Sequence, residues 1–252
     1  MGEDQPIYGL QTPALIAGSA FTCTEDIAAH YLQEIRNLQP EGPYYFCGAC
    51  FGGLVALEVA QQLQAAGQEV ALLVFIDTPS SPENQGASGG TWSYLRMHRD
   101  NLALLGLKDK VRYLIDRVRR KASLSAKKLA WKLCLKIGHL PMALRDQYVF
   151  DADVRAQKAY VAKPYDGRII MLWASLDIEK RYHENFKEAW ALLALGGVES
   201  YDLPFDHIGT FREPHVRILA DRLKACIDSA STPQTEYVIP HDYNPRRQQQ
   251  GR

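Results

Sequence analysis

The sequence predicts an α/β protein whose sheet is mostly parallel and covered by helices on both faces. Apolar segments typical of strands alternate along the chain with segments whose apolar residues recur at helical spacing. The segment 70–76, VALLVFI, is apolar throughout, as expected for a strand buried on both faces. Of the 252 residues, 46% are apolar, so a large core is available and global disorder is excluded.

Each element follows from its periodicity and from the glycines and prolines that bound it. In chain order we expect a helix over 25–38 with Thr24 as N-cap, a strand over 44–47, a helix over 52–66, a strand over 70–76, a helical stretch over 92–144 with breaks near Gly106 and Gly138, a helix over 154–161, a strand over 168–174, a helix over 183–195, a strand over 198–203 and a helix over 214–230. The stretch at about 92–147 interrupts the alternation and is interpreted as an inserted helical subdomain. The polar segment 232–252 is expected to be disordered, which leaves residues 1–231 as one domain.

The zero net charge conceals an uneven distribution. Residues 96–145 contain fourteen Lys and Arg but only three acids, a net charge of +11, and the rest of the chain carries −11. One interpretation is the solvated face of amphipathic helices. The other is a docking surface for an acidic partner or a phosphate group.

Several classes of protein are excluded by composition. No apolar run approaches the roughly 20 residues needed to span a bilayer. The first ten residues lack the basic and apolar regions of a signal peptide. Five cysteines, an odd number, do not suggest a disulfide framework. We therefore expect a cytoplasmic protein, and the neutral net charge gives no sign of nucleic-acid binding.

The most informative stretch is a strand that runs into GACFG, residues 48–52, and directly into a helix. This pattern is G-x-nucleophile-x-G with Cys50 at the nucleophile position, and it predicts a nucleophile elbow. In such a turn the nucleophile takes a strained backbone conformation, and Gly48 and Gly52 let strand and helix approach closely. The helix N-terminus would stabilise a thiolate and a developing oxyanion. The alternative is a buried structural cysteine at a glycine-rich turn.

Cys47 and Cys50 also form a C-x-x-C pair, a spacing used in dithiol redox chemistry and in half of a zinc site. No second C-x-x-C and no cluster of histidines supplies the remaining zinc ligands. We expect Cys47 to be buried inside its strand.

A cysteine nucleophile needs a base, and the base needs an orienting carboxylate. Of seven histidines, His207 stands out because its loop, PFDHIGT, follows a strand and precedes the last helix. Asp77 ends the strand after the elbow helix, where ligands bind in open α/β sheets, and Asp177 follows the next strand as the second candidate. His215 is interpreted as a surface or packing residue, and Asp206 is expected to point away from the site.

Together these residues resemble the type I thioesterase domains that end nonribosomal peptide and polyketide synthases. The likeness runs from about Pro6 to Cys226, and it is carried by QPIYGLQ, by IRNLQPEGPYYFCGACFGGLVALEVAQQLQAAGQEVALLVFIDTP and by DHIGTFREPHV. The family's elbow, G-x-S-x-G-G, is matched by Gly48, Cys50, Gly52 and Gly53.

The resemblance implies an α/β-hydrolase fold in which the insert forms a helical lid over an acyl channel. It implies Asp77 as the acid, with Asp177 as runner-up, His207 as the base and the Phe51 amide as an oxyanion-hole donor. It also implies that an acyl or peptidyl chain arrives on the phosphopantetheine arm of a carrier protein and leaves as acid, lactone or lactam, with no metal or other cofactor.

Two features depart from the family pattern. The nucleophile is Cys where Ser is usual, which would make the acyl-enzyme a thioester as activated as the substrate. The strand and the H-P-x-G-G-like loop that normally precede the QPIYGLQ-like segment, and that give the second oxyanion donor, do not precede it here. Either a truncated piece or a degenerate homologue would explain this, and we expect truncation.

Four functions therefore remain as hypotheses. The first is a chain-releasing thioesterase or cyclase, and the second is a stand-alone thioesterase that clears misloaded carriers. The third is a catalytically impaired homologue that binds carriers, and the fourth is a dithiol oxidoreductase that uses Cys47 and Cys50.

Overall fold

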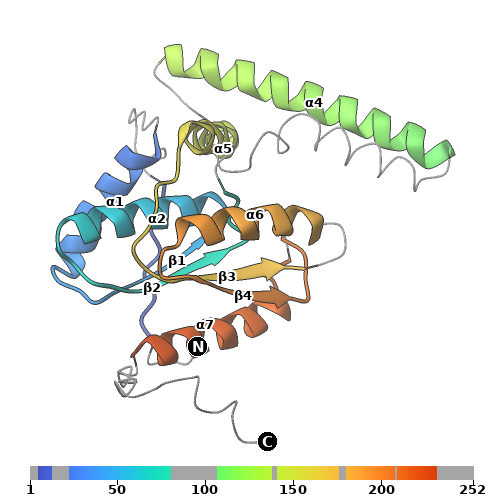
Figure 1. The fold of residues 1–252 in the computed structure, drawn as a ribbon. Helices are drawn as coiled ribbons and strands as arrows, with labels where there is room; N and C mark the ends of the chain where they lie inside the picture. The colour runs from blue at the N-terminus through green and yellow to red at the C-terminus, as the bar shows by residue number, and fades with distance from the viewer. Residues whose placement is uncertain are drawn as a thin grey trace, which may run out of the picture.

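The protein contains a four-stranded sheet in which every neighbouring pair of strands is parallel (Figure 1). The computed structural model describes residues 5–12, 23–80, 107–137, 141–175, 180–207 and 209–231. The strands are β1 (Tyr44–Ala49), β2 (Val70–Ile76), β3 (Ile169–Ala174) and β4 (Val198–Leu203), and they lie in the order β1-β2-β3-β4. The predicted α/β class with a parallel sheet is thus confirmed.

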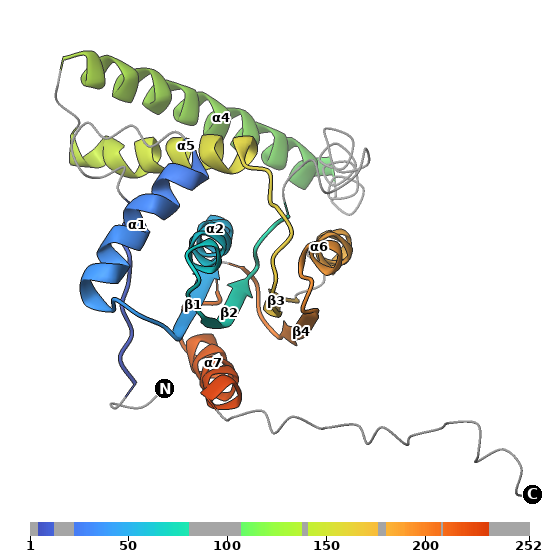
Figure 2. The ribbon, with the colours of Figure 1, turned by 60° about the vertical axis from the view of Figure 1, so that its left-hand side comes forward.

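Helices cover both faces of the sheet. They are α1 (Thr24–Leu38), α2 (Phe51–Ala65), α4 (Leu107–Lys136), α5 (Met142–Ala159), α6 (Lys180–Leu193) and α7 (His215–Ser231). Figure 2 shows α7 alone on one face, α2 and α6 on the other, and α4 with α5 beyond that second layer. We call α4 and α5 the lid helices.

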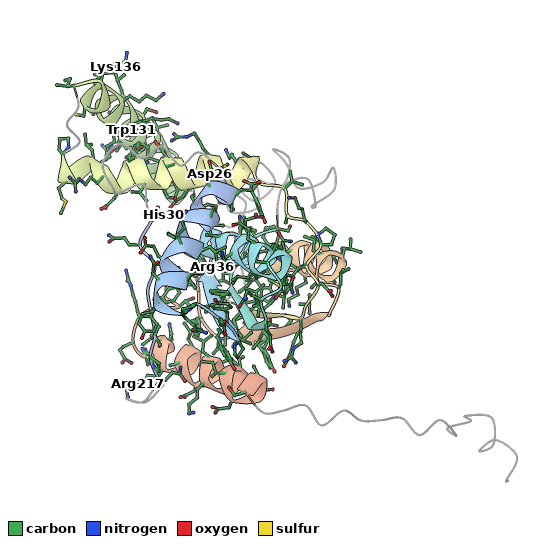
Figure 3. The ribbon with its side chains drawn as sticks, turned by 90° about the vertical axis from the view of Figure 1, so that its left-hand side faces the viewer. Asp26, His30, Arg36, Trp131, Lys136 and Arg217 are labelled. Atoms are coloured by element: carbon green, nitrogen blue, oxygen red, sulfur yellow. The ribbon has the colours of Figure 1, made fainter. Side chains whose placement is uncertain are left out.

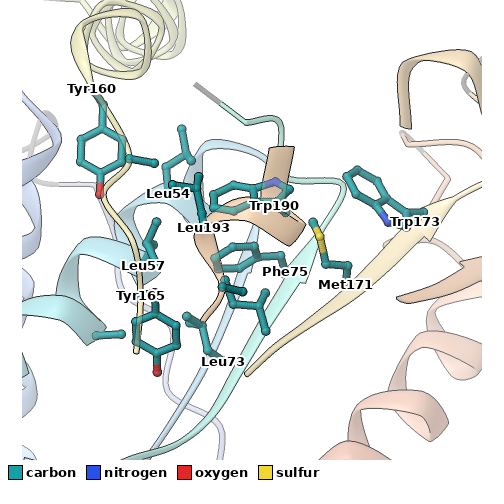
Figure 4. Close-up of a cluster of buried hydrophobic side chains, with 14 residues drawn as sticks. Leu54, Leu57, Leu73, Phe75, Tyr160, Tyr165, Met171, Trp173, Trp190 and Leu193 are labelled. Atoms are coloured by element: carbon teal, nitrogen blue, oxygen red, sulfur yellow. The ribbon is translucent and has the colours of Figure 1, made fainter. Parts of the chain in front are cut away.

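The two central strands, β2 and β3, are apolar throughout because they are buried on both faces, whereas β4 carries polar residues and is only partly buried. Leu73 and Phe75 of β2 point toward α2 and α6, where they join a cluster that includes Trp173 and Trp190 (Figure 4). The alternate residues of β2 pack with Phe205 and with α7 in a second cluster. All six residues of β3 are buried, so the centre of the sheet is the best-protected part of the described fold.

The lid helices pack on each other through an aromatic contact and are attached to the sheet layer by α5. Trp131 of α4 lies between the two helices (Figure 3), donates its indole N–H to Asp151 Oδ2 at 3.0 Å, and meets the Tyr148 ring edge-on at 5.1 Å. Just after α5, Tyr160 donates its hydroxyl to the buried Glu58 of α2 at 2.9 Å.

Two local predictions were wrong. Cys23, not Thr24, is the N-cap of α1, and the buried Thr24 hydroxyl donates to the Ala156 carbonyl at 3.3 Å instead of capping the helix. The break expected between 144 and 154 does not occur, because α5 is one helix over Met142–Ala159 whose sequence contains no glycine or internal proline. The predicted insert therefore continues as helix beyond residue 147. The predicted disordered segment 232–252 lies outside the described residues.

Among the described residues, no helix is both long and apolar enough to cross a membrane.

Candidate active site

The turn between β1 and α2 has the geometry of a nucleophile elbow. Cys50 lies between the last residue of β1 and the first residue of α2, with φ 50° and ψ −122°. A non-glycine residue at such positive φ stores roughly 1–3 kcal/mol of strain. Surrounding contacts hold it there, since the Cys50 N–H donates to the Ile76 carbonyl of β2 at 2.8 Å. The thiol is therefore presented at the carboxyl edge of the sheet and at the N-terminus of a helix.

Two glycines let the elbow close: Gly48, as the motif indicated, and Gly53 in place of Gly52. A Cβ at Gly48 would overlap the backbone of Gly52, and a Cβ at Gly53 would overlap the side chain of Thr78. A Cβ at Gly52 would have no neighbour within 4 Å. Close approach thus requires Gly48 and Gly53, because the buried Thr78 fills the space beside Gly53.

Phe51 opens α2, so its amide belongs to the first turn, whose N–H groups have no acceptor within the helix. Its ring packs against the core clusters on that side of the sheet, which fixes the position of the amide. An oxyanion formed on an acyl group attached to Cys50 would meet this N–H and the positive end of the α2 dipole.

Asp77 is held rigidly where β2 ends. Its backbone is in the left-handed region, with φ 46°, and its N–H donates to the Leu172 carbonyl of β3 at 3.0 Å. Its carboxylate is 5% exposed; Oδ1 accepts the Ala174 N–H at 2.6 Å, and Oδ2 accepts the His207 Nδ1–H at 3.0 Å. One oxygen thus anchors the carboxylate to the sheet while the other orients the imidazole.

His207 connects the carboxylate to the thiol. Its pKa is raised to about 10, mainly by the hydrogen bond to Asp77 and then by a hydrogen bond to Cys50, against an opposing effect of partial burial. Because Nδ1 faces Asp77, Nε2 is the ring nitrogen left for the Cys50 sulfur. The structure therefore brings together three residues that the sequence singled out from three distant segments.

The loop that carries His207 is braced by residues that sequence reasoning assigned no part in the site. Asp206 Oδ1 accepts the Gly209 N–H at 2.7 Å within the loop. His215 stacks on the buried Phe205, with ring centroids 4.9 Å apart, and its Nδ1 lies 3.3 Å from the Gly209 carbonyl. The D-H-x-G-T spacing was a signal for the contact between Asp206 and Gly209, but it gave none for His215.

Thr78 was also missed. It is fully buried, it fills the space beside Gly53, and its carbonyl accepts the Trp190 indole N–H at 3.1 Å. Its position directly after the strand-ending Asp77 was the available signal.

Other sequence-based candidates are not brought into this site. Asp177, the second candidate acid, lies outside the described residues. Cys47 is exposed, not buried as predicted, because it lies on β1, the first strand of the described sheet order. Cys50 follows it three residues later in the elbow, and both are free thiols in the structure. Among the described residues, no group of three or more His, Cys, Asp or Glu side chains could hold a metal ion.

A thiol, an imidazole and a buried carboxylate in this order can perform nucleophilic acyl transfer. Comparison with known proteins indicates the kind of acyl donor, which is a thioester. The model of the thioesterase domain matches residues 12–133, a stretch that contains Cys50 and Asp77.

The chain is also similar in sequence to parts of large synthetases and synthases. Malpinin synthetase of Mortierella alpina is 43% identical over 81 residues, which are 32% of this chain and 1% of that protein. Chondramide synthase cmdD of Chondromyces crocatus is 26% identical over 261 aligned positions, which cover 94% of this chain and 6% of that protein. The chain thus spans only a small part of the length of these curated relatives.

Among solved structures, the NocB thioesterase domain in covalent complex with a fluorophosphonate nocardicin G analog is 21% identical. Its TM-score is 0.53, over 83% of this chain and 77% of that one, which shows that the fold is shared. The shared fold and the match of residues 12–133 to the thioesterase-domain model indicate the class of protein that this chain resembles, namely hydrolases that act on thioester bonds. Within that class, its similarity is to thioesterase domains of nonribosomal peptide and polyketide synthases.

Proposed function

We propose that the protein releases an acyl or peptidyl chain from the phosphopantetheine arm of a carrier protein through a thioester-linked acyl-enzyme on Cys50. The observation that supports this most strongly is the Asp77–His207–Cys50 arrangement at a strained elbow. The relatives, which are synthetases and synthases, favour a carrier-borne substrate.

In the first half-reaction, the Cys50 thiol gives its proton to His207, whose imidazolium is stabilised by the Asp77 carboxylate. The thiolate attacks the substrate carbonyl carbon, and the Phe51 N–H donates to the resulting oxyanion. When the carbonyl re-forms, the bond to the pantetheine sulfur breaks, and His207 gives its proton to that leaving thiolate.

In the second half-reaction, water or a nucleophile within the chain gives its proton to His207 and attacks the Cys50 thioester. Collapse of this second tetrahedral intermediate breaks the bond to Cys50, which recovers the proton. Water yields the free acid, and an internal hydroxyl or amine yields a lactone or lactam. No bound cofactor enters either step, because the phosphopantetheine arm arrives with the substrate.

A cysteine nucleophile favours some of these products over others. Transfer from one thioester to another is roughly thermoneutral, so the acyl-enzyme stays activated and suits amines, weak hydroxyls and strained-ring closure. The test is the product distribution of Cys50→Ser with a chain able to cyclise. An unchanged ratio of cyclic product to acid would remove the argument for the thiol.

Acylation itself is tested by incubating the protein with an acyl-pantetheine thioester and recording its intact mass, with Cys50→Ala in parallel. We expect a mass increase equal to the acyl group that appears and decays only where Cys50 is present. A well-folded protein that never acquires this adduct would support a catalytically impaired homologue instead.

A further inference from the structure

The lid helix α4 has two faces of different character. Toward α5 it presents Trp131, which is 5% exposed and held by Asp151 and Tyr148. On the opposite side, apolar residues recur at intervals of three and four and remain open to solvent. The exposed large members are Ile115 (45% exposed), Val118 (67%), Leu129 (62%), Leu133 (51%) and Ile137 (81%). We call this row the outer stripe; at 1.5 Å per residue it is about 33 Å long.

A row this long is not the surface of an ordinary solvated helix. Solvent-exposed helix faces carry charged and polar residues, and contiguous exposed apolar surface usually marks an interaction site. The outer stripe lies on the side of α4 turned away from α5, so closer packing of the two lid helices would not bury it.

The charge beside the outer stripe indicates the sign of its partner. Arg119, four residues after Ile115, and Lys136, three residues after Leu133, are exposed and border the outer stripe, whereas Lys132 extends over the Trp131 ring. Figure 3 shows Lys136 on the side of α4 away from α5. Residues 117–145 contain nine Lys and Arg and no acid. This border repels a second copy of the chain and favours an anionic surface.

Side-chain sizes favour a protein helix over a lipid surface. Helices that lie in a membrane interface bury Trp, Phe and Leu. Here Trp131, the aromatic residue in this part of α4, points inward to α5. The middle of the outer stripe contains Ala122 and Ala126, both exposed, between bulkier residues at either end. Small residues flanked by large ones form a shallow groove into which a crossing helix can pack.

We propose that the outer stripe of α4 is a docking site for an acidic amphipathic helix of the protein that delivers the substrate. This rests on the proposed function, under which that protein is the carrier. Leu129 and Leu133 would contact the apolar face of the carrier helix, and Arg119 and Lys136 would pair with its acidic border. The lid would then take part in delivery of the acyl chain.

The test measures binding and turnover separately. Binding is followed by fluorescence anisotropy of a labelled, phosphopantetheine-loaded carrier domain of negative net charge. Turnover is measured with octanoyl-pantetheine, which needs no docking, and with the octanoyl-loaded carrier. The variant is Leu129→Ser/Leu133→Ser. The matched control is Leu192→Ser on α6, a leucine 80% exposed and remote from α4 in sequence.

For the outer-stripe variant we expect carrier affinity and kcat/KM for the loaded carrier to fall about tenfold or more, because truncating two leucines buried in an interface removes more than about 1.4 kcal/mol. Turnover of octanoyl-pantetheine stays within about twofold, and the control behaves as wild type. Arg119→Glu/Lys136→Glu slows association and weakens its dependence on salt.

Three outcomes overturn the proposal. Unchanged carrier affinity in the outer-stripe variant excludes docking there. Loss of binding to phosphatidylserine-containing vesicles, with carrier binding intact, assigns the outer stripe to a lipid surface. A lowered melting temperature of the variant alone shows that the outer stripe packs on the protein's own residues, such as those of 81–106. Failure of the proposed function gives a different result. In that case octanoyl-pantetheine does not acylate Cys50, whereas carrier binding can still be measured separately.

Discussion

At the scale of single residues, the protonation of His207 distinguishes a thiol nucleophile from a hydroxyl. Its pKa of about 10 means that the imidazole keeps its proton through neutral pH while Asp77 and Cys50 are its neighbours. A thiol that has already given its proton to His207 attacks as a thiolate beside the imidazolium. A hydroxyl nucleophile instead needs a neutral imidazole to accept its proton during the attack. The two nucleophiles should therefore respond to pH in opposite directions.

We predict that acylation of the native protein falls as pH rises through about 10, because the imidazolium that protonates the leaving thiol is lost. In Cys50→Ser the rate should instead climb with pH above neutrality, since the hydrogen bond to Asp77 still raises the His207 pKa. Single-turnover rates across pH, with octanoyl-pantetheine as substrate, check this. Superimposable profiles for the two proteins would contradict the thiolate–imidazolium assignment.

The elbow glycines allow a prediction with an internal control. Gly53→Ala should destabilise the protein by several kcal/mol or prevent folding, because its methyl group would overlap the buried Thr78. Gly52→Ala should leave stability within about 1 kcal/mol, since the new methyl group meets open space and alanine favours a helix. Urea denaturation compares them. Equal destabilisation by both would mean that the motif position, not packing, sets the requirement for glycine.

His215 is a positioning residue for His207, because it holds the intervening loop by its contacts to Phe205 and Gly209. His215→Phe keeps the stacking but removes the hydrogen bond, which is worth roughly 1 kcal/mol. We expect kcat to fall about fivefold with KM nearly unchanged. His215→Gln, which can still donate to the carbonyl, should recover part of kcat. A loss confined to thermal stability would refute the positioning role.

At the scale of elements, the attachment of the lid depends on polar groups buried between helices. Glu58 of α2 is 6% exposed and accepts hydrogen bonds from the Tyr160 hydroxyl at 2.9 Å and from Gln62 at 3.0 Å. A buried carboxylate that loses a donor pays the desolvation penalty of an unsatisfied charge.

Tyr160→Phe should therefore lower the free energy of unfolding by about 1–3 kcal/mol. Tyr201→Phe is the matched control, because that tyrosine also donates to a carboxylate, but the accepting Glu199 side chain is 37% exposed, so the bond contributes less. Denaturant titration of both variants gives the comparison. Equal loss of stability in the two variants would contradict the claim that burial of Glu58 strengthens its hydrogen bond to Tyr160.

The sequence predicts an element well where local hydrophobic periodicity determines it, and poorly where a tertiary contact does. Hydrophobic periodicity located β2 and β4 to the residue, because burial on a sheet leaves a clear pattern. It failed at Thr24, where a tertiary bond to Ala156 outweighs capping, and in α5, where weak amphipathicity hid a continuous helix. Contacts made after folding leave no trace in local periodicity.

At the scale of the molecule, parallel strand order brings the site together. Cys50 and Asp77 follow neighbouring strands β1 and β2, and the His207 loop follows β4, so all three lie at the same edge of the sheet. The sequence therefore suffices to place these residues near one another. It does not reveal that Gly53 rather than Gly52 meets a neighbour, or that His215 braces the loop, because side-chain packing across the chain decides both.

The same architecture predicts two levels of protection against solvent exchange. β2 and β3 are buried by clusters on both faces, so their amides should exchange only through global unfolding. Among the described side chains of α4, Trp131 alone is buried, so α4 should open by itself at much lower free energy. Hydrogen–deuterium exchange of the isolated protein should show α4 labelled long before β3. A saturating carrier domain should slow exchange in α4 while leaving β3 unchanged, because docking on the outer stripe orders the lid without altering the sheet. Equal protection of α4 and β3 in the isolated protein would instead mean that the lid and the sheet unfold as one unit.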